Sequence, residues 1–87
     1  MALPTAANAQ LRCGPRDKVV KSLAQKYKET QRFVGLAQNG SFMLEVFVSE
    51  DGKTFTVTTT SPQGVTCLRA GGINWQAVPP KASGISH

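Results

Sequence analysis

Few side chains in this 87-residue chain have the chemistry of a catalyst, and their positions favour none of the common catalytic arrangements. The one histidine is the last residue, His87, and the two cysteines are Cys13 and Cys67. Two cysteines and one terminal histidine do not have the spacing of a zinc site. The five acidic residues form no motif, and the chain has no phosphate-binding glycine loop. The sequence therefore predicts a protein that is not an enzyme and that uses no metal or cofactor.

The two cysteines have a structural interpretation instead. An even number of cysteines in a short chain predicts a disulfide when the protein is exported to an oxidising compartment. We expect Cys13 and Cys67 to form this bond, which would stabilise the fold by ~4 kcal/mol on a chain-entropy argument. The alternative is a cytosolic protein with two buried free thiols.

Basic residues are concentrated near the amino end of the chain. Seven of the ten basic residues and two of the five acidic residues lie at positions 12–32, which accounts for the whole net charge of +5. Lys18, Lys21 and Lys28 share one face of a predicted helix, and such a face attracts anionic envelope polymers or lipid surfaces electrostatically. The alternative is a solvated face that keeps the protein soluble. Nucleic acid is a disfavoured partner, because no aromatic residues alternate with these lysines.

The two ends of the chain differ in composition from its middle. Residues 1–9 look like the tail of an export signal, because Ala7-Asn8-Ala9 matches the small-residue box after which signal peptidase cuts. The alternative is a disordered alanine-rich tail. Residues 10–78 are predicted to form one domain and residues 79–87 a disordered tail. No run of about 18 apolar residues occurs, so we expect no transmembrane helix and a periplasmic or secreted protein.

The pattern of apolar residues predicts one helix followed by four strands. A helix is expected over residues 15–28, where apolar side chains recur at helical spacing after a proline suited to a first turn. A strand is expected over residues 29–36. The stretch 42–60 reads as a hairpin around the turn Glu50-Asp51-Gly52, and a short fourth strand covers residues 65–69. Short turns favour an antiparallel meander, so the predicted fold is α+β, with the helix across one face of the sheet.

The alternation within the hairpin predicts which side of the sheet is open. Phe42, Leu44, Val46 and Val48 fall on one face of the first hairpin strand and are expected to meet the helix. Met43 and Phe47 fall on the other face with Glu45, and the expectation is that they form a partner-binding patch with Trp75. Alternatively, the carboxyl-terminal segment folds over them. The threonine row Thr54, Thr56, Thr58 and Thr60 is interpreted as β-branched residues of an exposed strand face.

Several short motifs follow one another between residues 13 and 75. They are Cys13-Gly14-Pro15-Arg16-Asp17, Tyr27-Lys28-Glu29-Thr30, Gly64-Val65-Thr66-Cys67-Leu68, and Gly71-Gly72 followed by Trp75. This order resembles a group of small exported proteins of unknown function from alphaproteobacteria. The resemblance implies a periplasmic location and a paired cysteine, and it implies no activity. The favoured role is a non-enzymatic binding or accessory module that contacts a protein complex or forms a homodimer. An electrostatic binder of anionic envelope components is the alternative.

Overall fold

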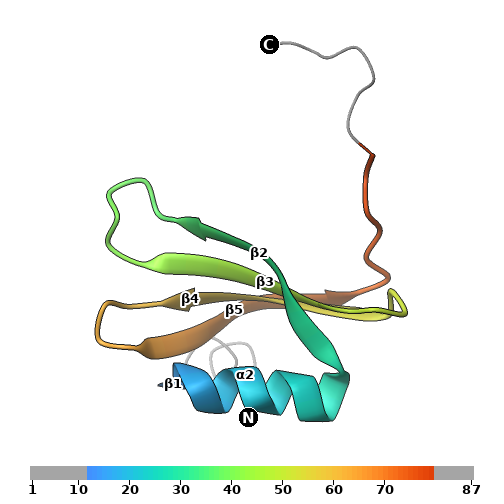
Figure 1. The fold of residues 1–87 in the computed structure, drawn as a ribbon, viewed down its shortest axis with the longest axis horizontal. Coiled ribbons are helices and arrows are strands. Elements are labelled where there is room, and N and C mark those ends of the chain that lie inside the picture. Colours follow the sequence, from blue (N-terminus) through green and yellow to red (C-terminus); the bar gives the residue numbers. More distant parts are fainter. Residues whose placement is uncertain (1–11, 80–87) are drawn as a thin grey trace, which may run out of the picture.

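The computed structural model describes residues 12–79, which form one helix and a five-stranded antiparallel sheet (Figure 1). The elements in chain order are β1 (Cys13–Pro15), α2 (Arg16–Tyr27), β2 (Glu29–Leu36), β3 (Met43–Ser49), β4 (Thr54–Thr60) and β5 (Val65–Ile73). The predicted export-signal tail at residues 1–9, and the predicted carboxyl-terminal tail beyond residue 79, lie outside the described residues.

The sheet has one strand more than the sequence predicted. Its strand order is β1-β5-β4-β3-β2, so the meander of β2 to β5 is extended by β1 beside β5. β1 is only three residues long and contains a glycine and a proline, so it carries no alternating apolar signal. The expectation of four strands was therefore wrong, while the single helix and the antiparallel meander are confirmed.

Helix α2 begins directly after β1 and ends where the backbone turns left-handed. Pro15 precedes its first residue, and Asp17 in the first turn faces the positive end of the helix dipole. Lys28 has φ 58°, and its N–H bonds the carbonyls of Ala24 and Leu23, which closes the last turn. The helix connects strands on opposite edges of the sheet and lies along one face, while the chain after β5 leaves on the other side (Figure 1).

β5 continues further than its pattern indicated. The sequence suggested a break at Gly71-Gly72, yet β5 runs through both glycines to Ile73 and pairs with β4 from Thr66 to Ile73, with one register shift between Val57 and Thr58. The ring of Phe55 lies directly against Gly72, where an added Cβ would be 2.6 Å from Cε1 of the ring. An aromatic ring covering a strand glycine shields the exposed backbone there and keeps the pairing intact.

The faces of the sheet are reversed relative to the sequence prediction. Phe47 and Glu45 on β3 are both 0% exposed, and Glu45 is bound by Arg16 from the helix, so their face is the one that α2 covers. We call it the helix side. Phe47 is therefore not part of an open patch, and Met43, on the same face, is half-buried. The expectation that Met43 and Phe47 form an exposed surface was wrong. Arg16 on the helix pairs with Glu45, and this pairing allows the face that Glu45 shares with Met43 and Phe47 to lie under the helix.

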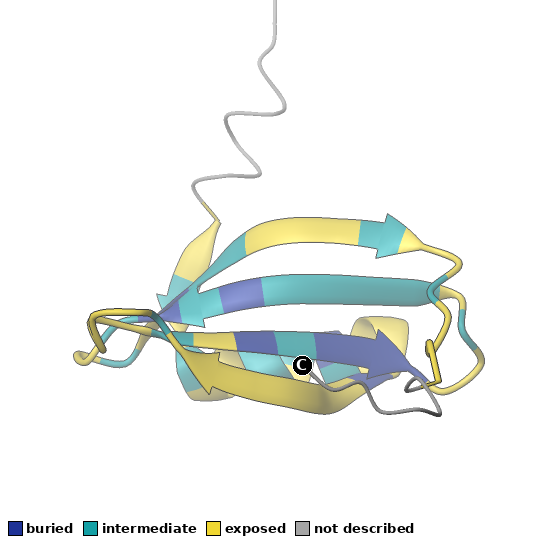
Figure 2. Cartoon of the chain, turned by 90° about the horizontal axis from the view of Figure 1, so that it is seen from above, coloured by how far each residue is buried: buried dark blue, intermediate teal, exposed yellow. Residues whose placement is uncertain are grey.

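The threonine row of β4 is also on the helix side. The register places Thr58 opposite Glu45 and Thr56 opposite Phe47, and residues opposite each other in an antiparallel pair share a face. The interior of this small domain is consequently rich in polar groups. The buried polar residues are Glu29, Glu45, Ser49, Thr58, Thr60 and Thr66, whereas the buried apolar ones are Leu23, Phe47 and Val48 (Figure 2).

Candidate functional site

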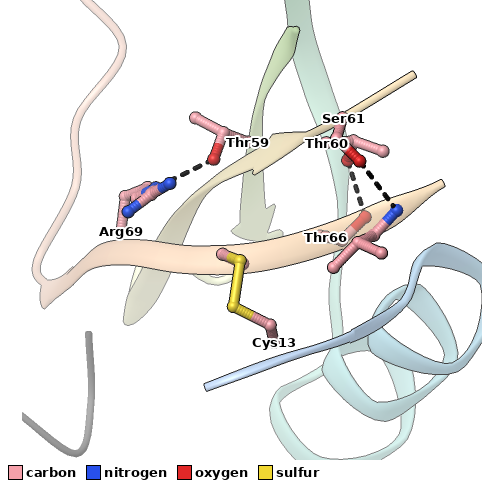
Figure 3. Close-up of a disulfide and its surroundings, with 8 residues drawn as sticks. Cys13, Thr59, Thr60, Ser61, Thr66 and Arg69 are labelled. Atoms are coloured by element: carbon pink, nitrogen blue, oxygen red, sulfur yellow. Dashed lines mark hydrogen bonds between the residues drawn. A yellow bond between two sulfur atoms is a disulfide. The ribbon is translucent and has the colours of Figure 1, made fainter. Parts of the chain in front are cut away.

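A disulfide joins Cys13 to Cys67, as predicted (Figure 3). The two residues are directly opposite each other in the β1–β5 pair, and 54 positions separate them in the sequence. Both thiols are therefore consumed in a structural bond, and the free-thiol alternative does not apply. The bond fixes the short strand β1, and with it the start of α2, to the strand that would otherwise be the edge of the sheet.

One buried carboxylate connects the helix to the centre of the sheet. Glu45 accepts a hydrogen bond from Arg16 Nε at 2.9 Å, a second from Arg16 Nη2, and a third from Gln31 Nε2 on β2. The hydrogen bonds from Arg16 hold the pKa of Glu45 below its ordinary value, although burial acts in the opposite direction. All three donors serve the folded structure, so we assign this cluster to positioning of α2 and not to chemistry.

The face of the sheet opposite the helix, which we call the open face, is apolar. By register it carries Phe33, Leu44, Val46, Phe55 and Val57. Phe33 is 64% exposed and Leu44 is 40% exposed. The open face continues onto β2, an edge strand in which every residue after Glu29 is exposed (Figure 2). Such contiguous apolar surface beside an unpaired edge is typical of an interaction site.

Two arginines flank the open face. Arg69 donates a hydrogen bond from Nε to the Thr59 hydroxyl at 2.8 Å (Figure 3). The guanidinium carbon of Arg32 lies 5.9 Å from the centre of the Phe33 ring and 5.6 Å from that of Trp75, within the range of cation–π attraction. The strand carboxylates Glu29 and Glu45 are buried, and Glu45 is on the helix side. Arg32 and Arg69 thus supply positive charge beside the open face, while the exposed carboxylates of Glu50 and Asp51 lie in the turn between β3 and β4.

Trp75 folds back onto the end of the sheet. Its indole N–H donates to the Ser49 carbonyl at 2.8 Å, its ring stacks against Arg32, and the side chain is half-buried. Of the three residues predicted to form a partner patch, Trp75 is therefore the one that borders the open face. The structure does not bring it together with Met43 and Phe47, which are on the helix side.

The lysines of the predicted basic face are all exposed but do not form one site. Lys18 and Lys21 are on α2, whereas Lys28 lies past its end in the left-handed position. Lys18 borders a groove between the helix and the sheet, and Lys28 lines a separate shallow hollow beside Glu50 and Asp51. The electrostatic attraction that the sequence predicts is therefore spread over two parts of the surface.

The groove between α2 and the last two strands was not foreseen from the sequence, and we call it the helix–sheet groove. It is an open groove of about 640 Å³, and its apolar walls include Val19, Leu23 and Leu68. Glu29 lines it and is 1% exposed, yet its Oε1 has no hydrogen-bond partner among the described residues. A buried acceptor without a partner costs about 1–3 kcal/mol, which marks this carboxyl as unusual. Glu29 is the first residue of β2, shortly after the helix, and nothing in the local sequence indicates that its carboxyl is buried.

Comparisons of the chain with models of protein families, with curated proteins and with solved structures found no match. Within residues 12–79, the helix is neither long nor apolar enough to cross a membrane. The same part of the chain contains no group of three or more metal-binding side chains.

Proposed function

We propose that this protein is a non-enzymatic interaction module of the periplasm, and that it binds another protein through the open face. The observation that carries the proposal is the exposed apolar surface of the open face and of the edge strand β2. Phe33 and Leu44 on the open face are 64% and 40% exposed, and on β2 Val34 and Leu36 are 56% and 74% exposed. Exposed apolar side chains of this size stabilise a small domain only when a partner covers them.

The border of the open face favours one kind of partner. Arg32 and Arg69 supply positive charge on this side, and the whole chain carries a net charge of +5. Two copies meeting face to face would bring these charges together, which opposes self-association. A different protein with an apolar surface bordered by acidic residues has the complementary chemistry. Strand β2 extends the same surface, since its outer edge can pair with a strand of that partner.

The periplasmic part of the proposal is supported by the paired cysteines and by the Ala7-Asn8-Ala9 box. Structural disulfides persist in oxidising compartments and are rare in the cytosol. The non-enzymatic part is supported by the sequence, in which both cysteines are consumed in the disulfide and the one histidine is residue 87. Fractionation of cells that produce the untagged protein from its natural gene tests the location, because an exported protein is released with the periplasmic fraction.

The interaction is tested by capture from periplasmic extract at low and high salt, with one variant on each side of the molecule. Leu44→Glu places a carboxylate in the open face, and Gln25→Glu makes the same charge change on the exposed side of α2. We expect the wild type and Gln25→Glu to retain a defined partner at high salt, and Leu44→Glu to lose it. Capture that disappears at high salt in the wild type contradicts the proposal and favours electrostatic binding through the lysines. Light scattering that gives twice the mass of the chain assigns the open face to a second copy.

A further inference from the structure

Strand β2 exposes apolar side chains on both of its faces. By register, Phe33 lies on the open face, whereas Val34, opposite Glu45, and Leu36 lie on the helix side. All three are exposed to solvent. A partner that rests flat on the open face covers Phe33 and leaves Val34 and Leu36 in water. Covering all three together requires a partner that passes along the outer edge of β2.

The outer edge of β2 is unprotected over half of its length. β2 is the last strand on its side of the sheet, and no described residue pairs with it beyond β3. Natural proteins commonly protect such an edge with charged side chains, proline or a bulge. In β2 the register shifts between Gln31 and Phe33, and beyond this shift the residues Phe33, Val34, Gly35 and Leu36 carry no charge and no proline. Residues 33–36 are therefore the part of the edge that can accept another strand.

The middle of this edge has room for a side chain of a partner. Gly35 lies opposite Leu44, so the side of Gly35 that would carry a side chain belongs to the open face. A Cβ added at Gly35 would meet no atom within 4 Å. A side chain from a neighbouring strand can therefore occupy the space beside Gly35 and pack against Phe33 and Leu44. Glycine within a strand often marks a place where another backbone approaches closely.

The two faces of the edge define the chemistry of the strand that fits it. Side chains of an added strand alternate between the open face and the helix side. They would meet Phe33 on the first and Val34 and Leu36 on the second, and no charged residue lies between Arg32 and Glu45 in the sequence. The complementary segment is therefore apolar on both faces. Arg32 is exposed at the end of this stretch, which favours an acidic residue of the added strand beside it.

We propose that the protein partner contributes a short apolar β-strand, with an acidic residue beside Arg32, that pairs with β2 along residues 33–36. Main-chain hydrogen bonds to the edge supply affinity, and the side chains on the two faces supply specificity. This inference rests on the proposed function, and it specifies which part of the partner binds and to which backbone. A partner that uses the open face alone has no contact with the edge.

The first experiment is hydrogen exchange of the full-length oxidised protein, alone and loaded with the partner captured from periplasmic extract. In the free protein, the amides of residues 33–36 that point away from β3 should exchange rapidly, and the partner should slow them at least about tenfold. The central strand β4, which is paired on both sides, is the internal control and should not change. Slow exchange of these edge amides in the free monomer overturns the proposal, because the edge is then already covered. Unchanged exchange in the complex overturns it as well.

The second experiment substitutes two matched apolar residues. Leu36 is 74% exposed on β2, and Ile73, at the end of β5, is 70% exposed. Leu36→Lys should bind the captured partner at least about tenfold more weakly than the wild type, and Ile73→Lys should bind it equally well. If Leu36→Lys binds like the wild type while Leu44→Glu does not, the partner rests only on the open face, which overturns this inference and keeps the proposed function.

Two further outcomes decide the identity of the strand. A wild-type protein that captures nothing at high salt overturns the proposed function and this inference together. Slowed exchange of residues 33–36 that accompanies twice the mass of the chain in light scattering shows that the added strand comes from a second copy, and it overturns the assignment to a different protein.

Discussion

Arg16, the first residue of helix α2, holds the fully buried carboxylate of Glu45 on β3 through two hydrogen bonds. The guanidinium group is partly exposed, so the pair extends from the surface to the interior of the domain. Gln31 on β2 binds the same carboxylate from a second strand. Glu45 therefore joins α2, β2 and β3, and its position fixes where the helix lies on the sheet.

The contribution of this pair to stability depends on pH. Because hydrogen bonds from Arg16 lower the pKa of Glu45 from the ordinary 4.5, the folded state favours the ionised carboxyl. The stabilisation is complete above about pH 4.5 and is lost as the pH falls further, through the lowered pKa of the folded state. We expect the free energy of unfolding of the wild type to decrease steeply below that pH.

The variant Glu45→Gln tests this origin of acid sensitivity. It keeps the shape of the side chain but not the charge, so we expect it to be less stable at neutral pH by about 1.5–3 kcal/mol, the usual contribution of a hydrogen bond to a charged group. Its stability should fall less between neutral and acid pH than that of the wild type. Urea unfolding at a series of pH values measures both quantities. Identical pH profiles of the two proteins would show that other carboxyls cause the acid sensitivity.

A second prediction concerns the disulfide. With a sequence separation of 54 between its cysteines, the chain-entropy argument predicts that the bond contributes about 4 kcal/mol, a large part of the stability of a small domain. Adding a reductant should lower the urea midpoint of the wild type strongly. The double variant Cys13→Ser/Cys67→Ser should show the low midpoint with and without reductant. If reductant leaves the wild-type midpoint unchanged, the bond does not stabilise the fold.

The sequence predicted where the helix and the strands lie better than it predicted which face of the sheet the helix covers. The helix, the β2 strand and the hairpin follow their apolar periods and turn residues closely. On β3, however, apolar residues occur on both faces, with Met43 and Phe47 on one and Leu44 and Val46 on the other. A rule that exposes charged residues places Glu45 outside. The partner that allows its burial is 29 residues away, and nothing in the local pattern indicates it.

The sequence predicted that one face of the sheet is an apolar candidate site, but it did not predict which face. An apolar sheet face with Trp75 near its border was expected, and such a face is present, but it is the opposite one and Trp75 contacts Arg32 and Ser49 there. The helix–sheet groove has no local signature, because its lining comes from the helix, from β2 and from the last two strands. Its lining includes Gly71 and Gly72, whose pattern suggested the end of a strand.

A third prediction uses two strand glycines as a matched pair. An added Cβ at Gly72 would lie 2.6 Å from the Phe55 ring, whereas at Gly35 it would meet no atom within 4 Å. Gly72→Ala should therefore displace the ring and cost about 1–3 kcal/mol. Gly35→Ala should be neutral or stabilise by up to about 1 kcal/mol through the unfolded chain. Urea midpoints compare the two variants, and equal midpoints would show that the Phe55 ring moves aside freely.

The last prediction concerns two buried hydroxyls that satisfy each other. Oγ1 of Thr60 and Oγ1 of Thr66 are 2.6 Å apart across the β4–β5 pair, and both residues are buried (Figure 3). Thr66→Val alone leaves the Thr60 hydroxyl buried without this partner, which should cost about 1–3 kcal/mol. Thr60→Val alone should cost a similar amount.

The double variant Thr60→Val/Thr66→Val separates the hydrogen bond from the cost of an unpaired hydroxyl. It removes both polar groups and keeps the shapes of the side chains, so we expect it to be nearly as stable as the wild type. The free energies of unfolding of the four proteins, measured in urea, then form a double-mutant cycle with a coupling energy well above zero. If the effects of the two single variants simply add in the double variant, the hydroxyls are satisfied separately, and the polar interior beneath the helix is more hydrated than these contacts indicate.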